Sequence, residues 1–585
     1  LNLKLNYLFD KVPMSHSSSL RFAAVSFAFL LLSGTAMAQA IPTTVEPGRV
    51  QRDISRDLRP STIATPAELG TAPEVAAPRG AKNVTFVLKD VIVEGGQKLS
   101  RARIHSIYAG KIGKTVSLAE IYGVANQITR AYRDNGYLLS RAIVPKQQIK
   151  NGIVRIQIIE GFVSGYTIDG KDFGGRQQLD AYAKRLVASG TLSAGNLERY
   201  LLLMNDLPGI QVRSILAPST TVFGGTDLRL IVEQKKFAGS ASIDNFGNKF
   251  LGPQRVTLTG SANSLFGGTD QVNGAFLWAP AADELEFYNV SYGQNIGNEG
   301  TRASVNMGYT HTDPTLPASL GGLLDPEGES YILGFNLAHP FIRSRALNVT
   351  GAAGFDFTKN KTDFNASPIF APLETEDDQR IARLSAQINY LDRFAGYNAA
   401  SGTVSKGLDI LGSSGRGDAN LSRPQGDPSF TKLNMEASRL QRLYGSLTGL
   451  IGLSGQYSFN PLLASEEFGF GGTDFGRGYD FSEITGDQGL AGKAELAYGF
   501  APNYKYLETY QLYTFYDLGK VWNRDPAAGQ EARESAASAG IGTRLNFLPN
   551  LRGDTFIAKP LTRDVTSRGE HGDDWRFKFS VTSNF

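Results

Sequence analysis

A loop that carries one arginine between two glycines has the residue types needed for a buried ion pair. Its sequence is DFGRGYD, at residues 474–480. Arg477 brings a permanent charge and a planar fork of donors, and the flanking glycines let its backbone lie close to other backbone. A carboxylate, Asp517, lies further along the chain, at the centre of FYDLG at residues 515–519. These residues predict an Arg477–Asp517 ion pair, and the alternative is an ordinary surface-loop arginine.

The segment around Asp517 is typical of a β-strand with two different faces. Phe515, Asp517 and Gly519 share one face, and Leu, Thr and Tyr side chains alternate with them on the other. A charge is costly against lipid, so in a membrane strand Asp517 must point into a wet interior. The arginine loop is then expected to fold inward, with Gly478 and Tyr479 beside the strand wall.

Other reactive chemistry finds little support in the sequence. The chain has no cysteine, five scattered histidines and a net charge of +3, which argues against a thiolate or histidine metal site and against nucleic-acid binding. The glycine-rich run at 469–472 lacks the Lys-Ser/Thr of a phosphate loop. Glu160 ends a predicted strand and is interpreted as a solvated or structural acid rather than a general base. We therefore expect no catalytic residue, no cofactor and no metal.

The first segment, residues 1–38, has the features of an export signal. Arg21 precedes an apolar run from 22 to 32, and Ala36-Met37-Ala38 forms a cleavage site. Residues 1–13 precede the first methionine and are interpreted as an over-long start. No later window is apolar enough for a transmembrane helix, so any membrane crossing is expected to use strands.

A short charged helix is predicted next, within residues 39–81. Val50, Ile54 and Leu58 recur every four residues and form a thin apolar stripe on an otherwise ionic segment. We expect either a frayed tail or a polar helix resting in a water-filled lumen, followed by a Pro-rich linker.

Two α+β units in tandem are predicted at residues 82–161 and 162–236. In the first, a strand over 84–93 precedes a helix that starts at the capping box SLAE, residues 117–120. Each unit repeats a β-α-α-β-β plan.

From residue 237 to 585 amphipathic strands replace helices. The segments alternate apolar with small or polar residues over about ten positions, which is typical of tilted membrane strands around a wet interior. A soluble sandwich would have shorter strands and a packed inner face. The length predicts about sixteen antiparallel strands. Trp575 and the terminal Phe585 lie on the apolar face of the last segment.

Several motifs of the chain match a known family. The sequences GYLLS (136–140), VPKQ (144–147), GIVRI (152–156), IIEG (158–161), NDLPG (205–209) and DNFG (244–247) accompany the loop and strand motifs. With them the chain resembles the outer-membrane transporters of two-partner secretion, the TpsB or hemolysin secretion/activation protein (ShlB/FhaC/HecB-like) family. Gly476 stands where this family usually has Val, and the FxDxG pattern is matched in full.

The resemblance implies a mainly β fold, with a 16-stranded antiparallel transmembrane β-barrel preceded by two POTRA domains and an N-terminal plug helix. It implies a bacterial outer-membrane location with the POTRA domains in the periplasm. A large secreted, hemolysin- or adhesin-like (TpsA-type) exoprotein would be received there and threaded unfolded through the barrel without ATP. Outer-membrane lipid, lipopolysaccharide and the barrel-assembly machinery are the other expected partners.

The resemblance also assigns roles to individual residues. Phe585 with Trp575 is expected to be the assembly signal, and Gly136, Tyr137, Pro145 and Gln147 are expected to contribute to client capture. The alternative for the POTRA units is a rigid spacer. For the whole chain the alternatives are a membrane-protein insertase of the same superfamily and a passive porin or polysaccharide channel.

Overall fold

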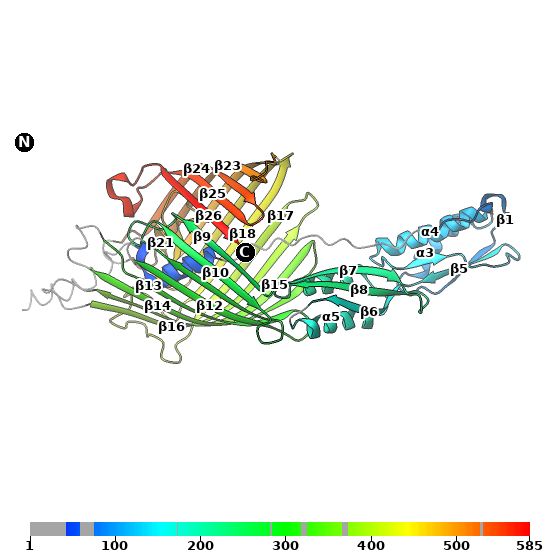
Figure 1. Ribbon diagram of the computed structural model, residues 1–585, viewed down its shortest axis with the longest axis horizontal. Helices are drawn as coiled ribbons and strands as arrows, with labels where there is room; N and C mark the ends of the chain where they lie inside the picture. Colours follow the sequence, from blue (N-terminus) through cyan, green and yellow to red (C-terminus); the bar gives the residue numbers. More distant parts are fainter. Residues whose placement is uncertain are drawn as a thin grey trace, which may run out of the picture.

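The computed structural model describes residues 43–58, 75–171, 174–280, 284–316, 325–364, 373–502, 504–526 and 530–585. Two small α+β units extend from one end of a large barrel, and a helix lies inside that barrel (Figure 1). The expected export signal lies outside these residues, as does most of the predicted linker. No helix within the described ranges is long and apolar enough to cross a membrane.

The first α+β unit is a three-stranded sheet covered by two helices. The sheet order is β2-β5-β4, with β2 parallel to β5, and β1 pairs with β3 in a separate small sheet. Ser117 and Glu120 form the predicted capping box, which fixes the start of the long helix α4. The elements are β1 (Thr85–Val87), β2 (Asp90–Glu94), α3 (Arg101–Tyr108), β3 (Thr115–Ser117), α4 (Leu118–Asp134), β4 (Arg141–Ile143) and β5 (Ile153–Ile159).

The strand expected over 84–93 is two strands in two different sheets. Leu88 lies between them, is fully buried and donates its backbone N–H to Lys114 O at 3.0 Å, so the chain changes sheet there. The predicted β-α-α-β-β plan includes a helix at this point, but α3 has only eight residues and no residue range was predicted for it.

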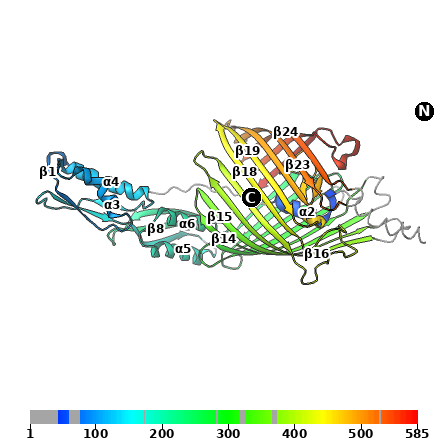
Figure 2. The same cartoon turned by 180° about the vertical axis from the view of Figure 1, so that it is seen from behind.

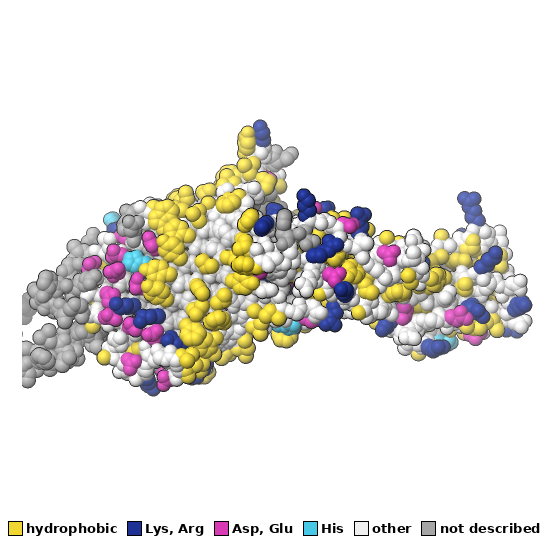
Figure 3. Space-filling view, turned by 60° about the horizontal axis from the view of Figure 1, so that its bottom comes forward, with side chains coloured by type: hydrophobic (Ala, Val, Ile, Leu, Met, Phe, Trp, Pro, Cys, Tyr) yellow, Lys and Arg dark blue, Asp and Glu magenta, His cyan; other side chains and the backbone are white. Residues whose placement is uncertain are grey.

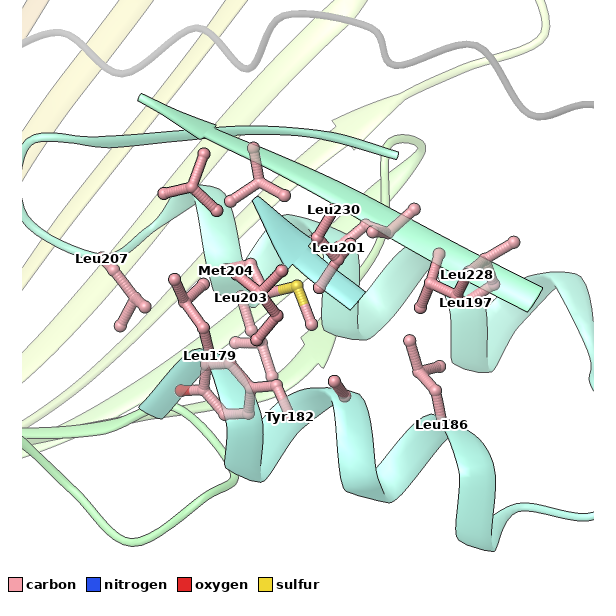
Figure 4. Close-up of a cluster of buried hydrophobic side chains, with 14 of the residues drawn as sticks. Leu179, Tyr182, Leu186, Leu197, Leu201, Leu203, Met204, Leu207, Leu228 and Leu230 are labelled. Carbon is pink, nitrogen blue, oxygen red and sulfur yellow. The ribbon is translucent and has the colours of Figure 1, made fainter. Parts of the chain in front are cut away.

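The second unit repeats this plan with the sheet order β6-β8-β7. Its two helices pack a leucine-rich core against the sheet (Figure 4). Tyr182 and Leu186 of α5 and Met204 of α6 have no exposed surface. The elements are β6 (Phe162–Gly170), α5 (Arg176–Ala188), α6 (Ala194–Asn205), β7 (Ile210–Pro218) and β8 (Gly225–Gln234).

Ion pairs hold the second unit on the barrel. Arg343 donates to Asp206 at 2.7 Å, Arg345 to Glu198 at 2.8 Å, and Arg199 lies 3.4 Å from Glu299. The barrel partners belong to strand ends and short turns at a single rim. The second α+β unit is therefore anchored to one rim of the barrel.

The barrel is closed by antiparallel pairing throughout the described chain, and the predicted sixteen-stranded fold is confirmed. The last strand pairs with the first over Ser580–Asn584. The strands are β9 (Phe237–Asp244), β10 (Arg255–Asn263), β11 (Asp270–Trp278), β12 (Leu285–Ile296), β13 (Thr301–Thr312), β14 (Pro326–Arg343), β15 (Leu347–Phe364), β16 (Leu373–Leu391), β17 (Tyr397–Gly407), β18 (Thr431–Tyr444), β19 (Leu447–Ser458), β22 (Gln488–Phe500), β23 (Thr509–Trp522), β24 (Arg533–Leu548), β25 (Leu551–Pro560) and β26 (Arg576–Asn584).

The three longest strands far exceed the expected ten residues, since β14, β15 and β16 have 18, 18 and 19. They extend past the apolar band of the outer surface into a region of charged side chains (Figure 3). Cross-strand neighbours such as Glu329 and Lys361 are charged there. Pairing continues beyond the lipid because a β-ladder satisfies its own backbone groups in water as well as in a membrane.

A carboxylate forms the joint between the two α+β units. Glu160 accepts hydrogen bonds from the backbone N–H groups of Gln97 and Lys98 at 2.6 and 2.7 Å. The Tyr132 hydroxyl donates to it at 2.9 Å and Thr191, from the second unit, at 3.2 Å. Burial alone would raise the pKa of Glu160, but these donors outweigh burial and hold its pKa below the usual value. Glu160 is therefore a structural acid of the joint.

Replacement of Glu160 by Gln is expected to destabilise this joint at neutral pH. A carboxylate with a lowered pKa in the folded state stabilises the fold above its unfolded pKa, about 4.3, and stops doing so as the pH falls through its folded value. We expect Glu160→Gln to lose about 1–3 kcal/mol at pH 7, with the difference from wild type shrinking below pH 4. Urea-induced unfolding of the units in the full chain, followed by proteolysis, measures this.

Glu94→Gln is the matched control, because Glu94 makes an exposed ion pair with Arg155 in the same unit and exposed pairs contribute little. Equal losses for the two variants, or a loss for Glu160→Gln that does not depend on pH, would contradict this role.

Candidate functional site

The chain between β19 and β22, residues 459–487, enters the barrel lumen instead of staying outside. It contains a short 3-10 turn, η4 (Ala464–Glu466), and a small hairpin of β20 (Phe468–Phe470) and β21 (Ile484–Gly486). The DFGRGYD sequence joins the two strands of this hairpin. Gly476 has φ +85, and a Cβ there would lie 2.8 Å from the Phe470 ring. The glycine thus allows both the turn and the close approach.

Arg477 is fixed by two carboxylates of the barrel wall. Its Nε and Nη2 donate to Asp517 on β23 at 3.0 and 2.8 Å, and its backbone N–H donates to Asp517 at 2.9 Å. Its Nη1 donates to Glu495 on β22 at 2.7 Å. Asp517 is fully buried and Arg477 is 7% exposed. This is a desolvated, bidentate ion pair extended by a second acid.

The guanidinium also lies on an aromatic ring. The Cζ of Arg477 is 3.7 Å from the centroid of Phe515, two residues before Asp517 on the same face of β23. The Phe515 ring in turn covers Gly540 of β24, where a Cβ would lie 2.5 Å from it. A glycine on the neighbouring strand therefore makes room for the platform on which Arg477 stacks.

The rest of the loop motif binds the wall as well. Gly478 N–H donates to Ser538 Oγ at 3.1 Å, and the Tyr479 hydroxyl donates to Ala537 O at 2.9 Å. Asp480 pairs with Arg576 of the last strand, and that arginine also donates to Gly478 O at 3.0 Å. One loop thus contacts β22, β23, β24 and β26. Gly519 lies beneath the Phe470 ring, where a Cβ would be 2.2 Å from it.

The charged helix α2 (Pro47–Asp57) lies inside the barrel beside this loop (Figure 2). Val50 and Ile54 are buried against apolar residues of the β9–β12 wall and its connections, and Leu58 packs at the edge of this cluster. Arg49 pairs with Glu467 at 2.6 Å. Helix α2 is therefore held by an apolar stripe on one side and by charge on the other.

Helix α2 also contacts the loop itself. Asp53 accepts a hydrogen bond from Ser482 Oγ at 2.5 Å, and Asp57 accepts one from Thr473 Oγ1 at 2.7 Å. Arg49 donates to the carbonyl of Ala464 at 2.7 Å. The helix and the inserted loop thus occupy the lumen as one hydrogen-bonded assembly.

The residues considered for client capture are all partly buried. Gly136 has φ +85 directly after α4, and its carbonyl accepts from Ala194 N–H of the second unit at 2.6 Å. Tyr137 packs against the core of the first unit. Gln147 bonds both backbone groups of Arg155 at 2.7 Å and the carbonyl of Pro145 at 3.3 Å. These contacts give all four residues a part in the local structure.

The last residue lies at the barrel seam. Phe585 exchanges two backbone hydrogen bonds with Gly239 of β9, at 2.9 and 3.0 Å, and its ring lies where a Cβ of Gly239 would be. Trp575 is 61% exposed on the outer side just before β26. Phe585 thus contributes backbone pairing to the closure between the last and first strands.

Sequence reasoning missed Glu495, Asp480 and Arg576 as members of this site. Glu495 lies on the inward face of β22, which alternates with the apolar outer face, and its charge on that face is the signal that could have indicated it. Which loop residue it meets depends on the path of the loop, and a strand pattern carries no information about that path. Gly540 and Ser538 gave no signal beyond being small residues on β24.

Comparison with known proteins places this geometry in context. Residues 224–545 match the family described as haemolysin secretion/activation protein ShlB/FhaC/HecB, and residues 86–161 match the ShlB-type POTRA domain. The heme/hemopexin transporter protein HuxB of Haemophilus influenzae (strain 86-028NP) is 25% identical over 564 residues, 94% of this chain and 96% of the relative. The outer membrane transporter CdiB of Dickeya dadantii (strain 3937) is 23% identical over 434 residues, 72% and 75% of the two chains.

The fold is also similar to a solved structure. CdiB from Escherichia coli superposes with a TM-score of 0.69 at 17% identity, and the match covers 97% of this chain and 99% of that one. The family match spans more than half of the chain, and it includes the inserted loop, Arg477 and Asp517. The chain belongs to the ShlB/FhaC/HecB family of haemolysin secretion/activation proteins, the outer-membrane transporters of two-partner secretion.

Proposed function

We propose that this protein receives a large secreted partner polypeptide in the periplasm and passes it, unfolded, through its barrel to the cell surface. The observation that carries this proposal is the position of the two α+β units at one end of the barrel, with the second unit ion-paired to the rim. The lumen behind them holds a short helix and an inserted loop. We propose no nucleotide site in this protein. Transport would then be driven by folding or binding of the client outside the cell.

In this account Arg477 is a conformational anchor that keeps the inserted loop on the wall. Its guanidinium group is paired with Asp517 and Glu495 of the barrel wall, so its donors point away from the lumen centre. A direct contact with the client would need an exposed charge, and Arg477 is 7% exposed. The client is therefore guided by a loop that Arg477 positions.

Replacement of Arg477 by Ala is expected to abolish or sharply reduce client secretion while the barrel still reaches the outer membrane. The variant leaves the buried Asp517 without its cation and takes one of two cations from Glu495, so the loop detaches from the wall. Secretion is measured as client in the medium against client retained in cells, with the barrel quantified by heat-modifiable gel mobility.

Arg533→Gln is a control on the same barrel, because Arg533 is exposed and has no ion pair within the residues that the structure describes. Normal secretion by Arg477→Ala would refute the anchor role.

Helix α2 is proposed to plug the lumen at rest. It lies across the lumen, and its ion pair with Glu467 and hydrogen bonds with Ser482 and Thr473 can dissociate without disturbing a strand. Its apolar stripe is thin, with only Val50, Ile54 and Leu58 directed at the wall cluster. Both partners of the Arg49–Glu467 pair are buried, so release of α2 requires water or an entering chain to take over these polar contacts.

Deletion of residues 49–59 is expected to raise single-channel conductance in planar bilayers, because it removes this obstruction from the lumen. Arg49→Gln, which removes the pair with Glu467, should open the channel more often without changing its maximal conductance. Arg101→Gln, on α3 outside the barrel, serves as the control. Unchanged conductance after the deletion would show that α2 does not block the pore.

Client capture is proposed to use the open edges of the α+β sheets. Strands β2 and β7 lie at sheet edges and expose Ile92 and Ile215, at 42% and 48%. An edge strand offers unpaired backbone donors and acceptors to an extended polypeptide. Gly136, Tyr137, Pro145 and Gln147 of the first unit are proposed to contribute to this capture. Outer-membrane lipid and lipopolysaccharide around the apolar band, and the barrel-assembly machinery acting on the strand that ends at Phe585, are proposed as further partners.

An insertase of the same superfamily and a porin are the competing functions. The two α+β units and the helix in the lumen favour a transporter over both. Loss of one secreted protein upon deletion of this gene, with normal levels of other outer-membrane barrels, supports the transporter. Altered small-solute permeability with every secreted protein unchanged would favour the porin.

A further inference from the structure

A second arginine lies next to Arg477 and shares one of its carboxylates. Arg544 of β24 donates from Nη1 and Nη2 to Glu495 at 2.6 and 3.0 Å, and also to Gln511 at 3.0 Å. One oxygen of Glu495, Oε2, accepts from both arginines. Glu495 is 5% exposed at its side chain, whereas Arg544 is 37% exposed. The two cations therefore compete for one buried anion.

The surroundings of Arg544 repeat those of Arg477 one step along the strand. Arg544 lies 4.0 Å from the ring centroid of Tyr513, and Arg477 lies 3.7 Å from that of Phe515. Tyr513 covers Gly542 as Phe515 covers Gly540. The Tyr513 hydroxyl is held by Asp554 at 2.7 Å. Arg544 is thus seated by the same kind of platform, but with one side open.

That open side faces a cavity of about 610 Å³ near the end of the barrel that bears the α+β units. Its lining includes Gln511, Arg544, Asn546, Arg552 and Asp554. Arg552 is exposed and has no ion-pair partner among the described residues. Asp554 is the acid of this lining, at 3.6 Å from Arg544. Two arginines against one carboxylate make the cavity suited to anionic groups.

We propose that this cavity binds carboxylate side chains of a polypeptide, and that Arg544 is the positioning residue through which such binding tightens the hold of Arg477 on the wall. A carboxylate that draws Arg544 away leaves Glu495 to Arg477 and reduces the repulsion between the two guanidinium groups. Two guanidinium groups that bond the same carboxylate oxygen repel each other, and the repulsion is stronger away from bulk water. The identity of the polypeptide as a client in transit rests on the proposed function, but the coupling between the two arginines does not.

The function of such coupling is to keep the loop in place while a chain enters. An acidic segment arriving from the periplasm meets Arg544 and Arg552 before it reaches the buried anchor. Its binding would secure the loop against displacement at the moment when the lumen fills.

A single cysteine can report how firmly the loop is seated, because the chain contains no cysteine of its own. Ser538 is fully buried beneath Gly478 of the loop. In the full chain, Ser538→Cys is made together with Arg477→Lys, which weakens the anchor and makes the thiol reactive to a membrane-impermeant maleimide. Adding Arg544→Gln to this background is expected to slow labelling several-fold, and Arg533→Gln, the same change on the same strand, is expected to leave it unchanged.

A polyglutamate peptide added to the Arg477→Lys/Ser538→Cys chain should also slow labelling, and a polylysine peptide of equal length should not. The protection by polyglutamate should be weaker in Arg552→Gln and absent in Arg544→Gln. Faster or unchanged labelling after Arg544→Gln would overturn the competition for Glu495. Protection that persists without Arg544 would overturn its role as the anion ligand. Neither readout depends on secretion. A failure of the proposed transport function would be seen separately, as unchanged secretion in cells that lack this protein, while labelling still follows these expectations.

Discussion

A carboxylate buried in the wall of a membrane barrel is the constraint on which the rest of the site depends. Asp517 has no exposed surface and lies in the middle of β23. An unpaired charge at such a place is far too costly to persist, so a cation must reach it. The cation comes from a loop, and this requirement draws residues 459–487 into the lumen. The position of α2, which bonds the same loop, follows from it.

Small residues on the inner wall make this insertion possible. Gly540 and Gly519 leave space for the rings of Phe515 and Phe470, and Ser538 receives the backbone of Gly478. Larger side chains at these places would force the loop away from the wall. Small side chains on the inner surface of the barrel thus leave room for the loop, while the outer surface keeps the apolar band that the membrane requires.

Much of the fold could be predicted because its signals are local. The period-two alternation identified the barrel, and the parity of positions along 512–519 placed Asp517 inside. The capping box at Ser117 gave the start of α4. The division of residues 84–93 into two strands could not be predicted, because it depends on which sheet each half joins.

The site brings together residues that lie far apart in the chain, and only some of these residues could be predicted. Arg477 and Asp517 were found because each is an unusual charge in its setting. Glu495, Arg544 and Asp480 are ordinary charges on polar strand faces or in a loop, and their partners are set by the registers of β22, β23 and β24 and by the loop path. The proposed client-capture residues were chosen by motif, and their contacts in the structure lie within and between the two α+β units.

The most direct test of this account is a double-mutant cycle between Arg477 and Asp517, measured as the free energy of unfolding of the barrel in detergent with Arg477→Met, Asp517→Asn and both changes together. We expect a coupling energy of about 2–5 kcal/mol, with the double variant more stable than Arg477→Met alone, because removal of both partners leaves no unpaired charge at this position. Losses that simply add would contradict the claim that this pair holds the loop in the lumen.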